Sequence, residues 1–321
     1  MSEKKGCLMI DFITMIYNKI KNLKSLLFSI DFIKECKIRK LIGNIFKYEH
    51  NENNIYFILS NEKNGKEIIR NLTKNQQNNI KDVCIQFQQL LAENNVSEEQ
   101  KIVKLSDPDF VEVLTDAYEI SKSMNDIEKR KILSDLIYKK FKAEDEDESN
   151  TLSQSIRIMK TLTKNHLKLN SLFYMFRSGC LKEFKSPEEL NAFYDKYVSK
   201  LIDIPIDKIR DIGTTVVGSG CAVTYTFGSS VSSFFDNHLA EYYAKLITKE
   251  NISTEEEKQK NIIEILNKIW NQSGLTSAFP TAVGKCIGKT YLHDILGLDI
   301  TEKIEENPLK DTDKIATVQV L

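Results

Sequence analysis

Apolar residues recur at helical spacing along most of the chain, and the clearest example runs from Ser106 to Phe141. The sequence Ser106-Asp107-Pro108-Asp109 predicts a helix start, because it combines a capping oxygen, a proline with helical φ and carboxylates near the positive end of the helix dipole. Helices joined by a link as short as 121–125 are expected to fold back antiparallel and bury their apolar stripes together or against a third helix. The two stripes are formed by Phe110, Leu114, Ala117 and Tyr118 and by Ile132, Leu133, Leu136, Ile137 and Phe141.

The same periodicity predicts further helices on both sides of this hairpin. Ser186 and Ser253 each begin a capping-box sequence, and Gly274 and Gly297 follow apolar stripes as helix-ending residues do. Gly284 and Gly288 stand one turn apart in the last predicted helix, where they would let another backbone approach closely. The predicted helical segments are 8–30, 66–93, 153–162, 166–181, 190–202, 236–247, 254–273 and 281–296.

Three segments depart from the helical pattern. Residues 55–59 form an apolar, β-rich run, and residues 316–321 predict either an edge strand or a mobile end. Residues 212–235 hold 24 positions without a charge. Their four Gly, five Ser and four Thr argue against a membrane span. Alternation around Val223 and a turn at 218–220 favour a β-hairpin, with a helix or a span as the alternatives.

We therefore expect a mainly α protein, a multi-helix bundle with a small β-hairpin insertion. Residues 1–95 are predicted to form an N-terminal helical region with a short β element. Residues 96–321 are predicted to form a helical body with the hairpin near 214–227. The 5 prolines and 12 glycines among 321 residues agree with long helices, because they leave few breakers.

Composition limits the function classes. A net charge of −1 with 28% charged residues argues against a surface built throughout for nucleic acid. Residues 1–47 are locally basic, however, with ten Lys and Arg against four Asp and Glu. The six cysteines are scattered without a CxxC pair, so we expect reduced thiols and a cytoplasmic protein. The acidic run 144–148 is interpreted as a solvated loop, because self-repulsion of its like charges would disfavour a compact helix. Calcium binding is not predicted, since the run lacks the glycine and distal Glu of a calcium loop.

The sequence offers no convergent chemistry. His238 and Glu241 share one helix face at a spacing that can hold a metal, but no second such pair is present, and we interpret Asp236 as a helix cap beside an exposed His238. Cys180 and Cys221 neighbour glycines without a nearby imidazole, so buried inert thiols are expected. No GxSxG elbow, GxGxxG or GxxxxGK[ST] loop marks the 212–235 segment. We assign no catalytic, cofactor-binding or metal-binding residue, and no cofactor.

One resemblance adds to this reading. The segment Leu105 to Phe110, followed by Asp116-Ala117-Tyr118 and by Asp126 to Leu133, resembles a group of uncharacterised bacterial helical proteins. Leu275-Thr276 and the later Thr281 to Ile287 are similar to the ending of abortive-infection-type helical proteins. The resemblance covers roughly residues 100–300 and implies a place in bacterial defence against phage. It carries no catalytic residues to this chain.

Three functional hypotheses follow. The first is a non-enzymatic bacterial interaction or regulatory protein that acts through a protein partner or self-association, with a component role in phage defence. The second is a membrane-acting effector that uses the 8–30 amphipathic helix and the uncharged 212–235 segment. The third is nucleic-acid binding through the basic N-terminal arm. A hydrolase with an unrecognised site comes last.

Overall fold

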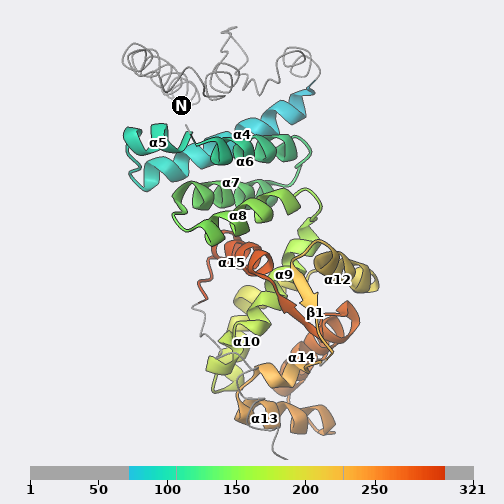
Figure 1. The fold of residues 1–321 in the computed structure, drawn as a ribbon. Coiled ribbons are helices and arrows are strands. Elements are labelled where there is room, and N and C mark those ends of the chain that lie inside the picture. The colour runs from blue at the N-terminus through green and yellow to red at the C-terminus, as the bar shows by residue number, and fades with distance from the viewer. Residues whose placement is uncertain (1–71, 106, 227, 301–321) are drawn as a thin grey trace, which may run out of the picture. The chain divides into compact units, whose positions relative to one another are not determined.

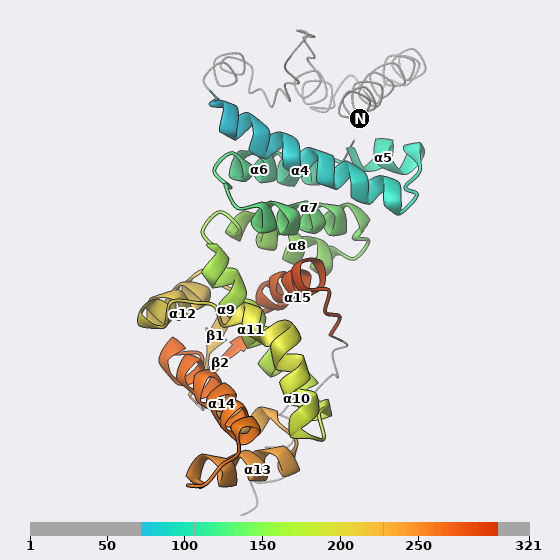
Figure 2. The ribbon, with the colours of Figure 1, turned by 180° about the vertical axis from the view of Figure 1, so that it is seen from behind.

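The computed structural model describes residues 72–300 except Ser106 and Phe227, and most of this part is helical. The chain divides into two compact units, residues 1–125 and 126–321 (Figure 1 and, from behind, Figure 2). The described residues confirm a mainly α protein with one small two-stranded antiparallel sheet. The predictions for 8–30, 55–59 and 316–321 fall outside the described residues.

The first unit is described from residue 72 onward as three helices, α4 (Lys74–Glu93), α5 (Glu98–Leu105) and α6 (Pro108–Ser121). Helix α6 packs against both α4 and α5. The rings of Phe87 and Phe110 lie 6.4 Å apart between their centroids, and Asn79 Nδ2 donates to the Lys122 carbonyl at 3.2 Å. The predicted cap is confirmed, because the Asp107 side chain accepts from the Asp109 backbone N–H.

The second unit contains nine further α-helices of at least three residues in its described part, together with short 3₁₀ turns and one π-helical turn. Its helices and strands are α7 (Ile127–Lys142), α8 (Glu146–Ile158), α9 (Lys164–Arg177), α10 (Pro187–Phe193), α11 (Ser199–Leu201), α12 (Ile209–Gly218), β1 (Ala222–Thr224), α13 (Asn237–Thr248), α14 (Thr254–Ser273), β2 (Ala278–Pro280) and α15 (Ala282–Leu296).

Helix α9 is the centre of the second unit. Every residue from Leu167 to Phe176 is buried, so this helix is enclosed on all sides. Its most extensive packing is with α15, and α12 also packs against it (Figure 1). Two polar side chains of α9 bond to neighbouring segments, one to the exposed Asp203 and one inside the core. Lys168 Nζ reaches Asp203 Oδ2 at 3.1 Å, and Asn170 Nδ2 donates to the Gly284 carbonyl at 2.8 Å.

Helix boundaries in the second unit follow the predicted local signals. Ser253 forms a complete capping box with Glu256, and Ser186 caps α10 by accepting from the Glu189 N–H. Gly274 and Gly297 end α14 and α15 in the left-handed conformation, with φ of 75° and 66°. These predictions are confirmed because each depends on residues within one turn of the helix end.

The acidic run 144–148 is not a loop, which corrects our expectation. Asp145 caps α8 by accepting from the Glu148 N–H, and Glu146, Asp147 and Glu148 form the first turn of the helix. These side chains are solvated, as expected. The prediction of self-repulsion failed because carboxylates at a helix N-terminus are stabilised by its unpaired N–H groups.

The predicted hairpin near 214–227 is also corrected. Residues 209–218 form α12, whose buried residues include Ile209, Ile212 and Val216 at helical spacing. The strand predicted around Val223 is present as β1, but it pairs with β2 rather than with residues before it. Residues 218–220 therefore link α12 to β1 and make no hairpin turn. The helical spacing was missed because Ile209, the first of these buried residues, precedes the uncharged run 212–235.

Candidate interaction surface

Two segments without charged residues meet at the small sheet. The first is 212–235, and the second is 269–284, a run of 16 residues between Lys268 and Lys285. Strands β1 and β2 join them in antiparallel register, with Val223 opposite Phe279. In a chain with 28% charged residues, two such runs in contact make an unusual surface. We call the exposed residues of both runs the charge-free face.

One side of the sheet is buried and the other is exposed. Ala222 and Ala278 are buried, whereas Val223 is 43% and Tyr225 57% exposed. The Tyr225 ring meets the Phe279 ring edge to face, with centroids 5.2 Å apart and planes at 89°. Edge-to-face pairs of this kind add about 1 kcal/mol to the area they bury. Tyr225 is thus held by the sheet while more than half of its surface stays accessible.

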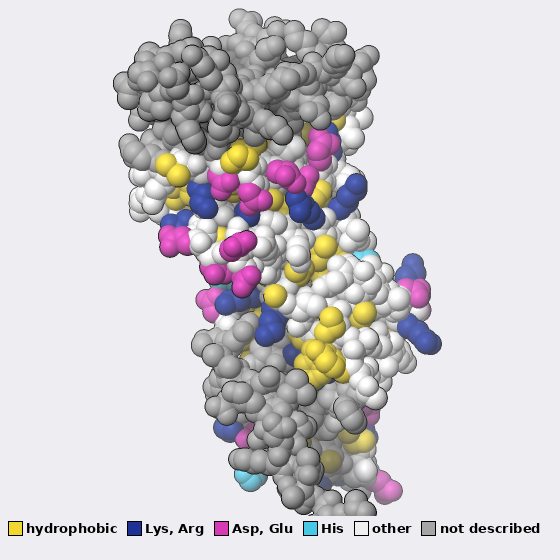
Figure 3. All heavy atoms as spheres, viewed as in Figure 1, with side chains coloured by type: hydrophobic (Ala, Val, Ile, Leu, Met, Phe, Trp, Pro, Cys, Tyr) yellow, Lys and Arg dark blue, Asp and Glu magenta, His cyan; other side chains and the backbone are white. Residues whose placement is uncertain are grey.

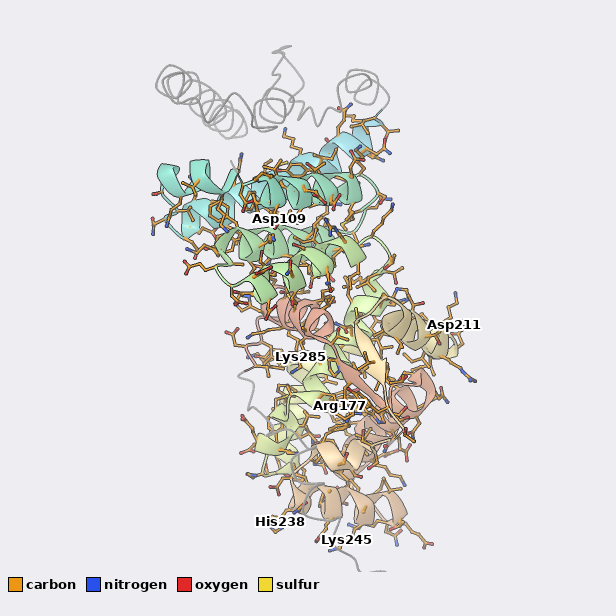
Figure 4. The ribbon with its side chains drawn as sticks, in the orientation of Figure 1. Asp109, Arg177, Asp211, His238, Lys245 and Lys285 are labelled. Atoms are coloured by element: carbon orange, nitrogen blue, oxygen red, sulfur yellow. The ribbon has the colours of Figure 1, made fainter. Side chains whose placement is uncertain are left out.

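Arg177, the last residue of α9, is partly exposed and packs against the Phe279 ring of β2. Its guanidinium carbon lies 4.1 Å from the centre of the Phe279 ring and 5.4 Å from that of Trp270. Its Nη2 donates to the Thr276 carbonyl at 3.1 Å. A cation–π contact contributes from about 0.5 kcal/mol where it is exposed to about 2 kcal/mol where it is desolvated, and Arg177 is only partly exposed. Figure 4 shows Arg177 inside the second unit among α9 and the strands, whereas Asp211 lies at the outside on α12.

Hydrogen bonds fix the loop after β1 to the segment before β2. The Ser229 N–H and hydroxyl both donate to the Thr276 carbonyl, at 2.9 and 3.1 Å. Trp270 Nε1 donates to the Ser229 carbonyl at 2.8 Å, and the Tyr225 N–H donates to the Ser277 carbonyl at 2.7 Å. The backbone of the charge-free face is therefore pre-organised, so that binding there would cost little ordering.

Several exposed residues of the 212–235 run carry hydroxyl groups. The exposed residues of this kind are Thr224, Thr226, Ser230, Ser232 and Ser233. Figure 3 shows yellow and white side chains over the strands, with charged side chains toward the edges of this region. The exposed residues of the charge-free face are therefore mainly hydroxyl-bearing, with Val223 and Tyr225 as its large exposed apolar side chains.

A second polar cluster lies between α7 and α15. Lys139 Nζ is 2.6 Å from Asp135 Oδ2 and donates to Thr290 Oγ1 at 2.7 Å. Asp294 Oδ1 is 2.7 Å from His293 Nδ1, and the second Asp294 oxygen is buried without a hydrogen-bond partner. Burial, followed by the Asp135 charge, raises the pKa of the Asp294 carboxyl. The lysine and the buried oxygens join two helices, so we interpret this cluster as structural.

The sequence-predicted metal candidate does not assemble. His238 and Glu241 are both exposed on α13, and Asp236 caps that helix through the His238 N–H at 3.0 Å while pairing with Lys185 at 2.7 Å. Figure 4 shows His238 on α13, apart from Arg177. Within the described part of the chain, no three His, Cys, Asp or Glu side chains converge as a metal site requires.

The cysteines of the described part are free thiols with little nucleophilic character. Burial raises the pKa of Cys84 to about 12 and that of Cys180 to about 11. Burial also raises the pKa of the Cys221 and Cys286 thiols. A thiol reacts as its thiolate, so these residues are protonated and inert near neutral pH. Cys221 is buried as expected, whereas Cys180 is only partly buried.

The run from Gly284 to Thr290 reads G-x-x-x-G-K-T, one residue shorter than a phosphate-binding loop. It lies inside α15, where both glycines are buried. A phosphate-binding loop must present free backbone N–H groups, and residues within a helix have already used theirs. This motif therefore marks helix packing.

Sequence reasoning missed the second half of the surface. The run 269–284 has no charge either, and comparing it with 212–235 could have predicted that the two segments meet. Arg177 gave no signal, because a single arginine at a helix end is ordinary. One of its four aromatic neighbours, Phe173, is on the same helix, and the other three come from distant segments, namely Phe234, Trp270 and Phe279.

Fold and surface together define a mainly α-helical protein with a small antiparallel sheet at an uncharged face. Residues 62–263 match a family model whose description, “:-like”, specifies neither an activity nor a ligand, and the chain belongs to that uncharacterised family. No significant match was found among the curated proteins or among the solved structures. Within the described residues, no helix combines the length and the apolar character needed to cross a bilayer.

Proposed function

We propose that this chain is a non-enzymatic bacterial interaction or regulatory protein of the cytoplasm, and that the charge-free face is its contact surface. The observation that carries the proposal is the meeting of two uncharged segments at a sheet that exposes Val223 and Tyr225. An exposed aromatic residue on a fixed backbone is the usual anchor of a protein interface. The pre-organised loop around Ser229 supports the same function.

The role in phage defence is part of this proposal. Its support is the resemblance of residues 100–300 to abortive-infection-type helical proteins, together with a fold made of packed helices. A defence regulator of this kind would act by binding a protein and needs no reactive cleft. The charge-free face supplies a surface on which such binding can be tested by single substitutions.

The alternatives use other parts of the chain. The basic arm within 1–47 and the amphipathic 8–30 segment, which carry the membrane and nucleic-acid hypotheses, fall outside the described residues. The uncharged 212–235 segment, on which the membrane hypothesis also relied, is divided among α12, β1 and a 3₁₀ turn. Its exposed face is rich in hydroxyls, which favours a protein partner over lipid.

The test is phage plaquing on bacteria that express the wild-type chain, Tyr225→Glu or Ile127→Glu. Ile127 is a matched control, because it is a large apolar residue of α7 that is 67% exposed. We expect the wild type and Ile127→Glu to reduce plaquing and Tyr225→Glu to lose that effect. Equal plaquing with and without the gene across a broad phage panel would remove the defence role. Protection by Tyr225→Glu equal to that of wild type would remove the charge-free face as its basis.

A further inference from the structure

Helix α9, at the centre of the second unit, begins with a capping box whose second member is a histidine. The Thr163 backbone N–H donates to His166 Nδ1 at 2.9 Å, and the Thr163 hydroxyl lies 3.0 Å from the same nitrogen. An imidazole nitrogen accepts a hydrogen bond only when it carries no proton. The cap therefore requires a neutral His166 with its ring proton on Nε2.

Two other described helices begin with the same kind of box, but their acceptors do not titrate near neutral pH. At the start of α4, the Thr73 N–H donates to Gln76 Oε1 at 2.9 Å. At the start of α14, the Ser253 N–H donates to Glu256 Oε2, also at 2.9 Å. The amide is neutral at every pH, and the hydrogen bond from Lys249 lowers the pKa of the Glu256 carboxyl. Of these three caps, the one on α9 is the one that mild acid can remove.

The surroundings of His166 disfavour a positive charge on its ring. Burial, followed by the Lys129 charge on α7, lowers the pKa of the imidazole below its ordinary value of 6.5. The positive end of the α9 dipole acts in the same direction. Glu128 is already engaged through both oxygens, by Lys164 Nζ at 2.9 Å and by the Tyr291 hydroxyl at 3.2 Å. The other charged groups at this end of α9 bond to one another or to a helix end, namely Asp126, Lys168 and Asp203.

We infer that His166 is a pH-sensitive cap, whose protonation opens the first turn of α9 and releases that turn from α7. A protonated Nδ1 can donate to the Thr163 hydroxyl, but the Thr163 N–H then faces another N–H and loses its acceptor. Residues 164–166 are half-buried, whereas Leu167 is buried, so the opening ends there. The ion pair of Lys164 with Glu128, which joins the turn to α7, is lost with it. This response is separate from contact at the charge-free face.

The direction of the pH effect follows from the lowered pKa of His166. An imidazole that binds protons less tightly in the folded chain than in the unfolded chain stabilises the fold at neutral pH. This contribution is fully present above about pH 6.5, and it is lost as the pH falls through the lower pKa of the folded state. The cap therefore responds to mild acid and not to alkali.

The experiment is amide hydrogen exchange, followed by NMR on the full chain at pH 7.5 and pH 5.5 and corrected for the intrinsic exchange rates. The informative amides belong to Thr163 and Leu167, whose acceptors are His166 Nδ1 at 2.9 Å and the Thr163 carbonyl at 3.0 Å. We expect the protection of both amides to fall about fivefold or more at pH 5.5 in the wild type, as loss of a helix cap predicts. The capping amides of Thr73 and Ser253 should keep their protection.

His166→Gln is the matched variant, because a glutamine at this position of the box accepts the N–H at every pH, as Gln76 does in α4. Its Thr163 and Leu167 amides should be equally protected at both pH values. His238→Gln removes an exposed histidine of α13 (Figure 4) and should respond to pH as the wild type does. A His166→Gln chain that loses as much protection as the wild type overturns the inference, and so does a wild type whose protection is the same at both pH values.

The protonation state of the ring gives a second measurement that needs no substitution. Nitrogen chemical shifts of the His166 imidazole at neutral pH should place its proton on Nε2. Its titration midpoint should lie below that of the same histidine in the chain unfolded by urea. A proton on Nδ1 at neutral pH, or a midpoint in the folded chain at or above that in urea, overturns the inference.

Discussion

The two halves of α15 are attached to the second unit in opposite ways. In its N-terminal half, Gly284 and Gly288 bring the helix into close contact with its neighbours. A Cβ at Gly284 would lie 1.8 Å from the Cys221 carbonyl oxygen, and one at Gly288 would lie 2.8 Å from Tyr174 Cβ. Close packing holds this half of α15 in place, and the same packing supports the charge-free face.

The C-terminal half buries Tyr291 and Leu292 and adds charged contacts with α7. Thr290 accepts from Lys139 of α7, which also pairs with Asp135, and the Lys131 ammonium group donates to the Asp294 carbonyl. Close packing depends on atomic volume, whereas a charge network depends on protonation. The charge-free face therefore rests on close packing that pH does not change, whereas the other end of α15 contains groups that titrate.

The largest expected effect is at the close contact. Gly284→Ala would push a methyl group into the Cys221 carbonyl, so α15 and β1 must separate. Overpacking of this kind costs about 3 kcal/mol. Chemical denaturation should therefore show a lower free energy of unfolding for Gly284→Ala. The matched control is Gly218→Ala at the end of α12, where an added Cβ meets nothing within 4 Å and no loss is expected. Equal stability of both variants would contradict the close packing of α15.

Removing a charge from the network in the C-terminal half should cost less stability than overpacking at Gly284. Lys139→Met keeps most of the side-chain volume but leaves the Asp135 carboxylate, with a side chain only 12% exposed, without its ion pair. Lys139 itself is 36% exposed, so water can replace part of the interaction. We expect a loss of about 2 kcal/mol, between the values for surface and buried pairs. Lys289→Met, at an exposed position of the same helix, is the control and should be near neutral. A loss for Lys139→Met no greater than for the control would mean that Asp135 is adequately solvated.

The comparison also separates what the sequence could predict from what it could not. Helix ends were predictable because Ser253, Thr281 and Gly297 act within one turn of themselves. The glycine spacing at 284 and 288 predicted a close approach, and the structure confirms it. The identity of the neighbours, the Cys221 carbonyl and Tyr174, was not predictable.

The pairing of β1 with β2 joins residues more than fifty positions apart, and no local pattern encodes such a partner. The contact surface was missed for the same reason, since its two uncharged halves become one only after the strands pair. The polar cluster around Asp294 likewise forms only because α7 and α15 are in contact, and no local sequence pattern predicts that contact. For both halves of α15, the sequence predicted the helix but not which distant segments contact it.

The helix cap at the start of α15 lies in its first half. Its removal should lower the free energy of unfolding less than Gly284→Ala or Lys139→Met does. Thr281 Oγ1 accepts from the Gly284 N–H at 3.0 Å and donates to the Gly220 carbonyl at 2.7 Å. Removing the hydroxyl in Thr281→Ala should cost about 1 kcal/mol, as loss of a helix cap usually does. Thr281→Ser keeps both hydrogen bonds and should retain the wild-type unfolding midpoint. If the serine variant loses as much stability as the alanine variant, the methyl group and not the hydroxyl matters at this position.

The smallest effect, and the one that tests titration, is expected at Asp294. Burial and the Asp135 charge raise its pKa above the ordinary value near 3.8, against the opposing effects of His293 and Lys139. A carboxyl whose pKa is higher in the folded state binds protons more tightly there, so stability is lost as pH rises through that range. Asp294→Asn removes the ionised form while its Oδ1 can still accept from His293, so this variant should unfold at a slightly higher denaturant concentration than wild type at pH 7.5. The advantage should shrink as pH falls toward the carboxyl pKa, where the wild-type residue is itself neutral. An advantage that is independent of pH would assign the effect to packing, and a variant less stable than wild type at pH 7.5 would mean that the lysines stabilise the carboxylate more than burial disfavours it.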